Sequence, residues 1–529
     1  MAGPPCKGPQ HRTAPAGSTG RGPTAPRVPF ETAESDEAVT ETSHHSPTTL
    51  RLQKVSTDLF IGGRWRPASD GSRIDVLDPA NGEKLADVAS ATVDDAIAAV
   101  DAADTALAGW SATAPRKRSE VLRRVFELMT ERVEEFAELI VLENGKALAD
   151  ARAEVVYAAE FFRWYAEEAV RVLGTVQAAP SGSNKIMVVR KPVGVSVLVT
   201  PWNFPAAMAT RKIGPALAAG CTVVLKPASD TPLTALAIAA LFEEAGAPAG
   251  VVNVLPSSRS GSVVSAMLDD PRVRKLSFTG STEVGQVLLA AAARTIVNCS
   301  MELGGNAPFL VFADADLDAA VEGAMVAKMR NGGEACTAAN RFYVEESVAA
   351  EFTRRLSEAM SALTIGPGLN EGVQLGPLVN AASRDKVAEL VEQTVRAGAS
   401  LVTGGSPLEG PGFYYPPTVL ADVPADAPVL REEIFGPVAP VVTFTTEEEA
   451  VRLANDTEYG LVSYVYTGDL GRGLRVSEAL DSGMVGLNRG VVSEAAAPFG
   501  GTKQSGIGRE GGHEGLLAFT ESTYIALSW

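Results

Sequence analysis

The sequence predicts an α/β protein in which a doubly wound parallel-sheet domain is joined to a second α/β domain and a small β element. Runs of β-branched residues alternate with helical segments of about 10–15 residues, first over 194–292 and again over 308–498. A chain of 529 residues has room for two or three domains. The last residues, 518–529, are apolar and β-prone, which predicts a strand that pairs with another edge.

The individual elements follow from local patterns. An alternating stretch over 59–66 predicts a strand, and residues 173–189, with turn signals at Pro180 and Gly182, predict an extended hairpin. The expected helices are 92–110, 115–142, 146–172, 205–219, 231–245, 261–268 and 280–292, and the expected parallel strands are 194–200, 221–225, 251–255 and 275–279. Open sheets of this kind bind ligands, often nucleotides, at the carboxyl ends of their strands.

The N-terminal segment differs in composition from the rest of the chain. Residues 1–50 contain eight prolines and five glycines and few large apolar side chains, so we expect a disordered extension over 1–55. No apolar segment typical of a secretory signal is present. Basic residues without an acid before Glu31 leave a transit peptide as the alternative, although the Pro and Gly content disfavours its amphipathic helix.

Charge and hydropathy exclude two classes of partner. The net charge of −18 disfavours nucleic acid or an anionic membrane surface. The 19 uncharged residues between Lys191 and Arg211 approach the length of a membrane span, but prolines interrupt them, so they predict a buried strand and a loop.

Cysteine and histidine usage restricts the chemistry. The chain has four cysteines without CxxC spacing, which argues against a disulfide scaffold or a structural zinc site and favours a reducing, cytoplasmic location. Beyond the first 45 residues the only histidine is His513. Imidazole-dependent hydrolysis or metal binding would have to use that residue, so we expect no metal and a nucleophile activated by other means.

Two glycine-rich segments are candidates for phosphate binding. Gly506 to Gly511 matches GxGxxG, but turn-forming residues precede it and no acidic residue follows at the required distance, so we reject it as a dinucleotide site. In contrast, an apolar strand leads directly into Gly280-Ser281-Thr282 and a helix, whose N-terminus favours a pyrophosphate. A simple N-cap by Ser281 is the alternative interpretation.

A cysteine and a glutamate are the candidates for catalysis. Cys336 follows the Gly332-Gly333 turn, where the backbone can approach a ligand closely. A thiol with an ordinary pKa of about 8.5 is mostly protonated at neutral pH, so the site must assist it. Glu302 precedes another Gly-Gly turn at the end of a strand, and its carboxylate can act as a general base.

Seven segments together resemble the aldehyde dehydrogenase superfamily in order and spacing, over roughly residues 57–529. They are Pro201-Trp-Asn-Phe-Pro205, Lys226-Pro-Ala-Ser229, Phe278-Thr-Gly-Ser-Thr282, Glu302-Leu-Gly-Gly305, Gly333-Glu-Ala-Cys336, Glu433-Ile-Phe-Gly-Pro437 and Pro498-Phe-Gly-Gly501. The resemblance implies a nicotinamide-cofactor domain (56–172 and 193–303), a catalytic domain (304–504) and an oligomerisation element (173–192 and 515–529). It also implies a homodimer or homotetramer.

The resemblance also implies roles for individual residues. Cys336 matches the nucleophile that adds to the aldehyde, Glu302 the general base for thioester hydrolysis, and Asn203 the side-chain donor of an oxyanion hole. Lys212 and Glu510 match positions that assist proton movement. The cofactor positions are Trp202, Asn203, Lys226, Ser229, Gly280, Ser281, Leu303, Glu433 and Phe435.

Position 229 bears on the choice of cofactor. Many NAD-preferring relatives have a glutamate there, whose carboxylate binds the ribose 2′-hydroxyl and repels a 2′-phosphate. Ser229 is small and neutral and lies close in sequence to Lys226. We therefore expect NADP to be used at least as well as NAD.

Within the superfamily the chain most resembles succinate-semialdehyde dehydrogenases. Arg211 and Arg330 match positions that bind the distal carboxylate of the substrate, and Ser493 matches a third donor. The expected reaction is the oxidation of succinate semialdehyde to succinate. The alternatives are another ω-oxo acid such as glutarate semialdehyde, a CoA-dependent acylating enzyme, which Glu302 disfavours, and a catalytically idle binding protein on the same fold.

Overall fold

The structure of the protein is a computed structural model that describes residues 55–528. Buried strands form the parallel centre of its first sheet, in the order β9–β8–β7–β10–β11. These strands are β7 (Val195–Val199), β8 (Thr222–Lys226), β9 (Val252–Val254), β10 (Val273–Thr279) and β11 (Asn298–Glu302). Within the described residues, the hairpin of β1 (Leu59–Ile61) and β2 (Arg64–Arg66) pairs antiparallel with β9, and β21 (Gly506–Ile507) pairs antiparallel with β11.

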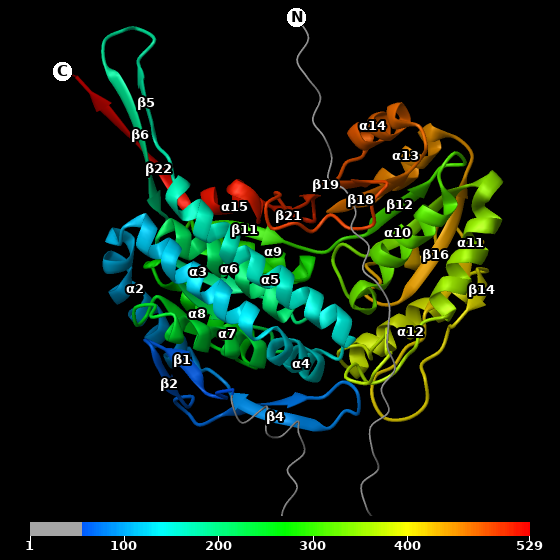
Figure 1. Ribbon diagram of the computed structural model, residues 1–529, viewed down its shortest axis with the longest axis horizontal. Helices are drawn as coiled ribbons and strands as arrows, with labels where there is room; N and C mark the ends of the chain where they lie inside the picture. Colours follow the sequence, from blue (N-terminus) through cyan, green and yellow to red (C-terminus); the bar gives the residue numbers. More distant parts are fainter. Residues whose placement is uncertain (1–54, 529) are drawn as a thin grey trace, which may run out of the picture. The chain divides into compact units, whose positions relative to one another are not determined.

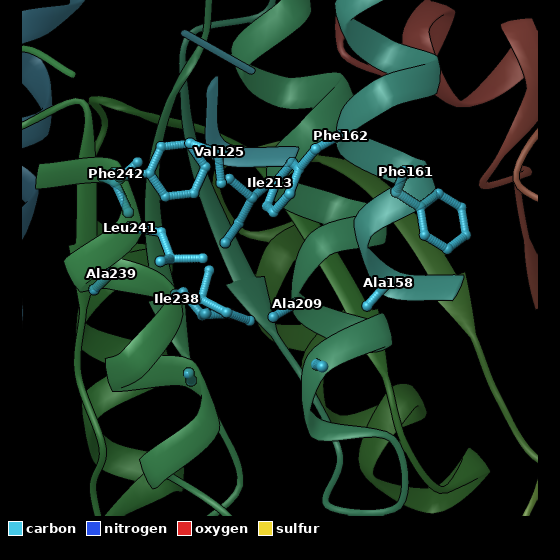
Figure 2. Close-up of a cluster of buried hydrophobic side chains, with 14 of the residues drawn as sticks. Val125, Ala158, Phe161, Phe162, Ala209, Ile213, Ile238, Ala239, Leu241 and Phe242 are labelled. Atoms are coloured by element: carbon cyan, nitrogen blue, oxygen red, sulfur yellow. The ribbon is translucent and has the colours of Figure 1, made fainter. Parts of the chain in front are cut away.

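Helices cover both faces of this sheet, which confirms the predicted doubly wound α/β class (Figure 1). One face is covered by α3 (Pro115–Glu131), α4 (Val133–Asn144), α5 (Leu148–Glu168), α6 (Pro205–Ala219) and α7 (Leu233–Glu244). The other face is covered by α2 (Val93–Ala112), α8 (Ser260–Asp269) and α9 (Thr282–Ala293). Figure 2 shows how side chains from α3, α5, α6 and α7 interdigitate in the first of these layers.

The second α/β lobe has a sheet with the order β14–β15–β16–β13–β12–β18–β19 among the described residues, parallel except at β14. Its strands are β12 (Ala307–Val311), β13 (Ala339–Glu345), β14 (Ser400–Thr403), β15 (Thr418–Ala421), β16 (Val438–Phe444), β18 (Val462–Tyr466) and β19 (Met484–Leu487). Its helices are α10 (Leu317–Met329), η2 (Arg330–Gly333), α11 (Glu346–Ser361), α12 (Ala381–Arg396), η3 (Pro428–Leu430), α13 (Glu447–Asn455) and α14 (Leu470–Ala479).

A smaller antiparallel sheet has the strand order β22–β6–β5. It consists of β5 (Thr175–Ala178), β6 (Lys185–Pro192) and β22 (Thr520–Leu527), so the C-terminal strand pairs with a hairpin more than 300 residues earlier (Figure 1). The remaining elements are the hairpin of β3 (Arg73–Leu77) and β4 (Lys84–Ala89), the pair β17 (Tyr459–Gly460) and β20 (Thr502–Lys503), η1 (Ala169–Arg171) and α15 (Gly512–Leu517).

The structure corrects several predicted elements. The single helix expected over 115–142 is two helices, because Arg132 leaves helical geometry (φ −116°, ψ 26°) and its guanidinium binds both oxygens of Glu244. The strand expected over 59–66 is a tight hairpin that turns at Gly62 and Gly63, both with positive φ. The β3–β4 hairpin was not predicted, because its strands are short and the sequence of β4, KLADVA, does not alternate between polar and apolar residues.

Two further expectations change at the ends of the described region. The segment expected to form the C-terminal strand, 515–529, begins with the end of α15, and its strand starts at Thr520. The extension expected over 1–55 lies outside the described residues except for Val55.

None of the helices in residues 55–528 combines the length and the hydropathy that crossing a membrane requires. The uncharged run 192–210 is divided between β7, a loop and α6.

Candidate active site

A cavity of about 410 Å³ lies where the carboxyl ends of β7, β10 and β11 face the second lobe. The first lobe supplies the loop after β7 and the turns after β10 and β11, and the second lobe supplies η2 and the residues after it. All of the predicted site residues line this one cavity except Glu302, Lys212 and Glu510. The cavity therefore brings together segments that are far apart in the chain.

Cys336 is held by an unusual turn. Asn331, Gly332 and Gly333 all have positive φ (55°, 62° and 78°), a conformation that favours glycine. A Cβ at position 333 would lie 2.3 Å from the carbonyl oxygen of Gly436, so only glycine fits there. Burial, with a contribution from Glu433, raises the pKa of the Cys336 thiol to about 12. The resting thiol is therefore neutral at physiological pH, and the thiolate must form during the reaction.

Glu302 is the last residue of β11 and is buried. Neither of its carboxylate oxygens has a hydrogen-bond partner within residues 55–528. Burial, together with the nearby Glu510, raises the pKa of Glu302 well above its usual range. Gly500 leaves room for this side chain, because a Cβ there would lie 2.7 Å from Oε1 of Glu302. A carboxyl with a raised pKa and free oxygens has the properties of a general base.

Asn203 lies in the loop between β7 and α6 and is buried. Its Nδ2 donates to the carbonyl oxygen of Glu334 at 3.0 Å, while its Oδ1 has no partner in the described part of the chain. The backbone carbonyl of Asn203 accepts hydrogen bonds from Lys146 Nζ at 2.8 Å and from Asn331 Nδ2 at 2.9 Å. The side-chain amide is thus fixed beside the segment that carries Cys336.

Lys212 and Glu510 form a buried network behind the cavity. Lys212 Nζ donates to Glu510 and, at 3.0 Å, to Ser277 Oγ, which in turn donates to Glu510 at 3.1 Å. The other oxygen of Glu510 lies 3.9 Å from Arg211. Because Glu510 raises the pKa of Glu302, the two carboxyls are close enough to interact electrostatically.

Two arginines lie at the substrate side of the cavity. The guanidinium of Arg211 is buried, lies 4.1 Å from the centre of the Phe499 ring, and donates to the Tyr157 hydroxyl at 2.7 Å. Its Nε is buried without a partner among the described residues. Arg330 lies over the Phe204 ring at 5.2 Å. With Ser493 these groups form a positively charged, hydrogen-bonding end of the cavity, which suits a carboxylate.

The other end of the cavity can hold a nicotinamide dinucleotide. Ser281 is the N-cap of α9, as the alternative interpretation expected, and the N-terminus of that helix also lines the cavity. A Cβ at Gly280 would lie 2.4 Å from the Phe278 ring, so glycine is required at the turn that leads into this helix. Burial lowers the pKa of the Lys226 ammonium to about 8.

The ribose and ring positions also fit such a cofactor. Glu433 accepts from the backbone N–H of Gly305 through Oε1 at 2.9 Å, and a Cβ at Gly304 would lie 3.1 Å from Oε2. The rings of Trp202 and Phe435 meet edge to face at 5.4 Å in the cavity wall. A carboxylate can accept hydrogen bonds from ribose hydroxyls, and an ammonium and a helix N-terminus can donate to hydroxyl and pyrophosphate oxygens.

Four residues that surround this site were not among the predicted site residues. Tyr157 binds Arg211, Asn331 and Lys146 bind the backbone of Asn203, and Glu154 pairs with Lys146. Of these four, only Asn331 could have been found from local sequence, because it lies directly beside the Gly-Gly turn. The others lie on or before α5, more than 50 residues before the groups that they contact in the loop after β7 and in α6, so no local pattern connects them to the site.

The remaining histidine lies elsewhere. His513 Nδ1 is 2.6 Å from Glu168, and neither residue lines the cavity. The nucleophile of this site is therefore not paired with the imidazole of His513.

Comparison with known proteins agrees with the fold. A sequence profile described as the aldehyde dehydrogenase family matches residues 65–525, and the chain belongs to this family. It is 59% identical, over 84% of its own length and 99% of the relative's, to a succinate-semialdehyde dehydrogenase of Paenarthrobacter nicotinovorans. It is 48% identical, over 88% of its own length and 97% of the relative's, to a glutarate-semialdehyde dehydrogenase of Pseudomonas aeruginosa. A crystal structure of an NADP-dependent enzyme of E. coli superposes with a TM-score of 0.89 at 48% identity, covering 90% of this chain and 99% of that one.

Proposed function

We propose that this protein oxidises succinate semialdehyde to succinate with NADP or NAD, through a thioester on Cys336. The observation that carries the proposal is that one cavity is lined by Cys336, by the cationic side chains of Arg211 and Arg330, and by the turn that starts α9. The similarity to a succinate-semialdehyde dehydrogenase supports the substrate. Glutarate semialdehyde, one methylene longer, is the second candidate, and the relative from Pseudomonas aeruginosa favours it.

Substrate binding and the first chemical step use groups at both ends of the cavity. Arg211, Arg330 and Ser493 bind the distal carboxylate and direct the aldehyde toward Cys336. The two arginines also favour the thiolate electrostatically. After releasing its proton to water, Cys336 Sγ forms a bond to the carbonyl carbon, and the carbonyl π electrons move to oxygen. Asn203 Nδ2 and the backbone N–H of Cys336 stabilise this oxyanion, each donor contributing about 3 kcal/mol.

The second half of the reaction regenerates the thiol. Bound NADP or NAD supplies the acceptor for the hydride that the thiohemiacetal carbon loses as it becomes a thioester. Glu302 removes a proton from water, the hydroxide adds to the thioester carbon, and the C–S bond breaks to give succinate and the Cys336 thiolate. Lys212 and Glu510 then move the proton away from Glu302. In sum, aldehyde, water and oxidised cofactor give acid, reduced cofactor and a proton.

We assign cofactor binding and catalysis to separate domains. We assign residues 56–172 and 193–303 to cofactor binding and 304–504 to catalysis, and we infer that the sheet of β5, β6 and β22 joins subunits of a homodimer or homotetramer. Its outer strands leave large apolar side chains exposed, among them Val176, Tyr524 and Ile525. A catalytic thiol requires a reducing compartment, so we place the enzyme in the cytoplasm.

Replacing Arg330 by alanine tests the carboxylate subsite. Loss of a charge-assisted hydrogen bond costs about 1.5–3 kcal/mol, so KM for succinate semialdehyde should rise about 10- to 100-fold. Propanal has no distal carboxylate and should show a change of less than about threefold. Initial rates with both aldehydes measure this. Equal changes for the two substrates would contradict the assignment of Arg330.

Replacing Ser229 by glutamate tests the cofactor subsite. The wild-type enzyme should use NADP at least as well as NAD, because Ser229 neither repels a 2′-phosphate nor requires a 2′-hydroxyl. In the variant, repulsion should lower kcat/KM for NADP by about 100-fold, whereas NAD should be little affected. The measurement is kcat/KM for each cofactor at saturating aldehyde. A wild-type enzyme that prefers NAD by a hundredfold would refute the expectation.

A further inference from the structure

A buried ion pair lies next to the proposed oxyanion hole. Lys146 Nζ is 2.6 Å from Glu154 Oε2, and the two side chains are 1% and 0% exposed. Neither residue lines the cavity, so neither can contact the aldehyde or the cofactor directly. Burying two charges costs several kcal/mol per ion, and a well-packed apolar pair often stabilises a fold equally well. A pair of this kind calls for an explanation beyond stability.

The ammonium of Lys146 also contacts the Asn203 loop. Besides Glu154, it donates to the backbone carbonyl of Asn203 at 2.8 Å and lies 4.3 Å from the centre of the Phe204 ring. Two of its three N–H groups therefore donate to oxygen, and its charge also lies over an aromatic ring. Two of these contacts are made to the loop that carries the Asn203 side chain. Lys146 therefore fixes the backbone of that loop at the residue whose amide faces Cys336.

Glu154 fixes the other side of the same loop. Helix α6 starts at Pro205, and its N-cap residue, Phe204, has no side chain that can accept from the first turn. Pro205 has no N–H, and the next two backbone N–H groups, of Ala206 and Ala207, donate to Glu154 Oε1 at 2.9 and 3.2 Å. Glu154 is therefore the cap of α6, provided by α5 from about 50 residues earlier in the chain.

Apolar side chains also pack α5 against α6. Ala158 and Phe162 of α5 and Ala209 and Ile213 of α6 belong to one buried cluster (Figure 2). The ion pair lies where the chain leaves the Asn203 loop and enters α6. Its particular effect is to set where this loop ends and the helix begins.

We propose that Lys146 and Glu154 are positioning residues of the oxyanion hole. Lys146 holds the Asn203 loop at the backbone carbonyl of Asn203, and Glu154 holds it at the start of α6. Together they place the Asn203 amide for the transition state. The inference rests on the role given to Asn203 under the proposed function. A displacement of a catalytic group by about 1 Å can cost about 100-fold in rate. The pair should therefore affect kcat and not the binding of the carboxylate at Arg211 and Arg330.

A double-mutant cycle tests this. Lys146→Met, which keeps the length of the side chain, should lower kcat about 100-fold and change KM for succinate semialdehyde less than about threefold. Asn203→Ala should lower kcat by about 10²–10³-fold. If Lys146 acts through Asn203, the double variant should be no more than about threefold slower than Asn203→Ala alone. Alkylation of Cys336 by iodoacetamide without cofactor, which needs no oxyanion hole, should stay within about twofold of wild type in every variant.

The outcomes separate the two proposals. Multiplicative losses in the double variant, or equal losses in kcat and alkylation, would overturn the positioning role, because Lys146 would then act independently of Asn203 or only maintain the fold. Wild-type kcat in Asn203→Ala would instead remove the oxyanion donor from the proposed function. If Lys146→Met does not fold, Glu154→Gln takes its place in the cycle, since Gln still accepts from α6 through Oε1 but cannot accept from Lys146 with its amide nitrogen.

A matched control lies on the same helix. Arg152 forms an exposed pair with Glu134 at 2.8 Å, far less buried than Lys146 and Glu154. Arg152→Met removes a pair of the same charges from α5 and should leave kcat within about twofold of wild type. A loss in Arg152→Met as large as that in Lys146→Met would show that removing any positive charge from α5 or the residues just before it has this effect, and would also overturn the proposal.

Discussion

Replacing Cys336 by serine lowers kcat for aldehyde oxidation by about 10⁴-fold or more, because the covalent route is lost. A hydroxyl is a much weaker nucleophile than a thiolate, and it needs a base to remove its proton. His513 lies outside the cavity, so its imidazole is not available to remove that proton. The rate of formation of reduced nicotinamide with succinate semialdehyde measures the loss, and cofactor binding followed by fluorescence should remain unchanged.

A second cysteine provides the matched control. Cys299 lies on β11, the strand that ends at Glu302, but it does not line the cavity. Cys299→Ser should keep kcat within about twofold of wild type, since an ordinary surface or strand position tolerates so small a change. If the serine variant at 336 retained more than a tenth of the wild-type rate, the covalent mechanism would be wrong. Equal losses at 299 and 336 would mean that both substitutions act through stability.

Replacing Glu302 by glutamine separates the two halves of the reaction. The amide cannot accept a proton from water, so hydrolysis of the thioester should slow and kcat should fall by about 10³-fold. Oxidation of the thiohemiacetal does not need this base. A rapid burst of about one reduced cofactor per active site should therefore remain, followed by a slow phase. Stopped-flow absorbance measures the burst, and mass spectrometry of the quenched enzyme should find the succinyl group on Cys336.

The pH dependence of kcat gives a second measure of the same base. Glu302 acts only when ionised, and its pKa is raised by burial and by Glu510. The wild-type kcat should therefore fall as the pH decreases through this raised pKa and should be constant above it. In Glu302→Gln this acidic limb should disappear, because the residual rate no longer requires the carboxylate. A variant without a burst, or with an unchanged acidic limb, would show that Glu302 does not act on the thioester.

The sequence by itself determined the α/β class and most of the central strands, and it supplied the candidates for the reacting groups. Strand runs such as 194–200 are apolar because both of their faces are covered, so composition alone reveals them. The candidate pair of Cys336 and Glu302 was found because glycine turns follow or precede each residue. Such turns are local features, and a local feature is visible without knowledge of the fold.

The tertiary structure alone decided how these groups are held. Neither proline nor glycine marks the break at Arg132, where the guanidinium pairs with Glu244, more than 100 residues later. Lys146 and Glu154 contact the Asn203 loop and the start of α6 only when α5 packs against them. The raised pKa values of Cys336 and Glu302 have the same origin, because they come from burial by residues of both lobes. Hydrogen bonds and desolvation between distant segments depend on the packed chain, and no local pattern encodes them.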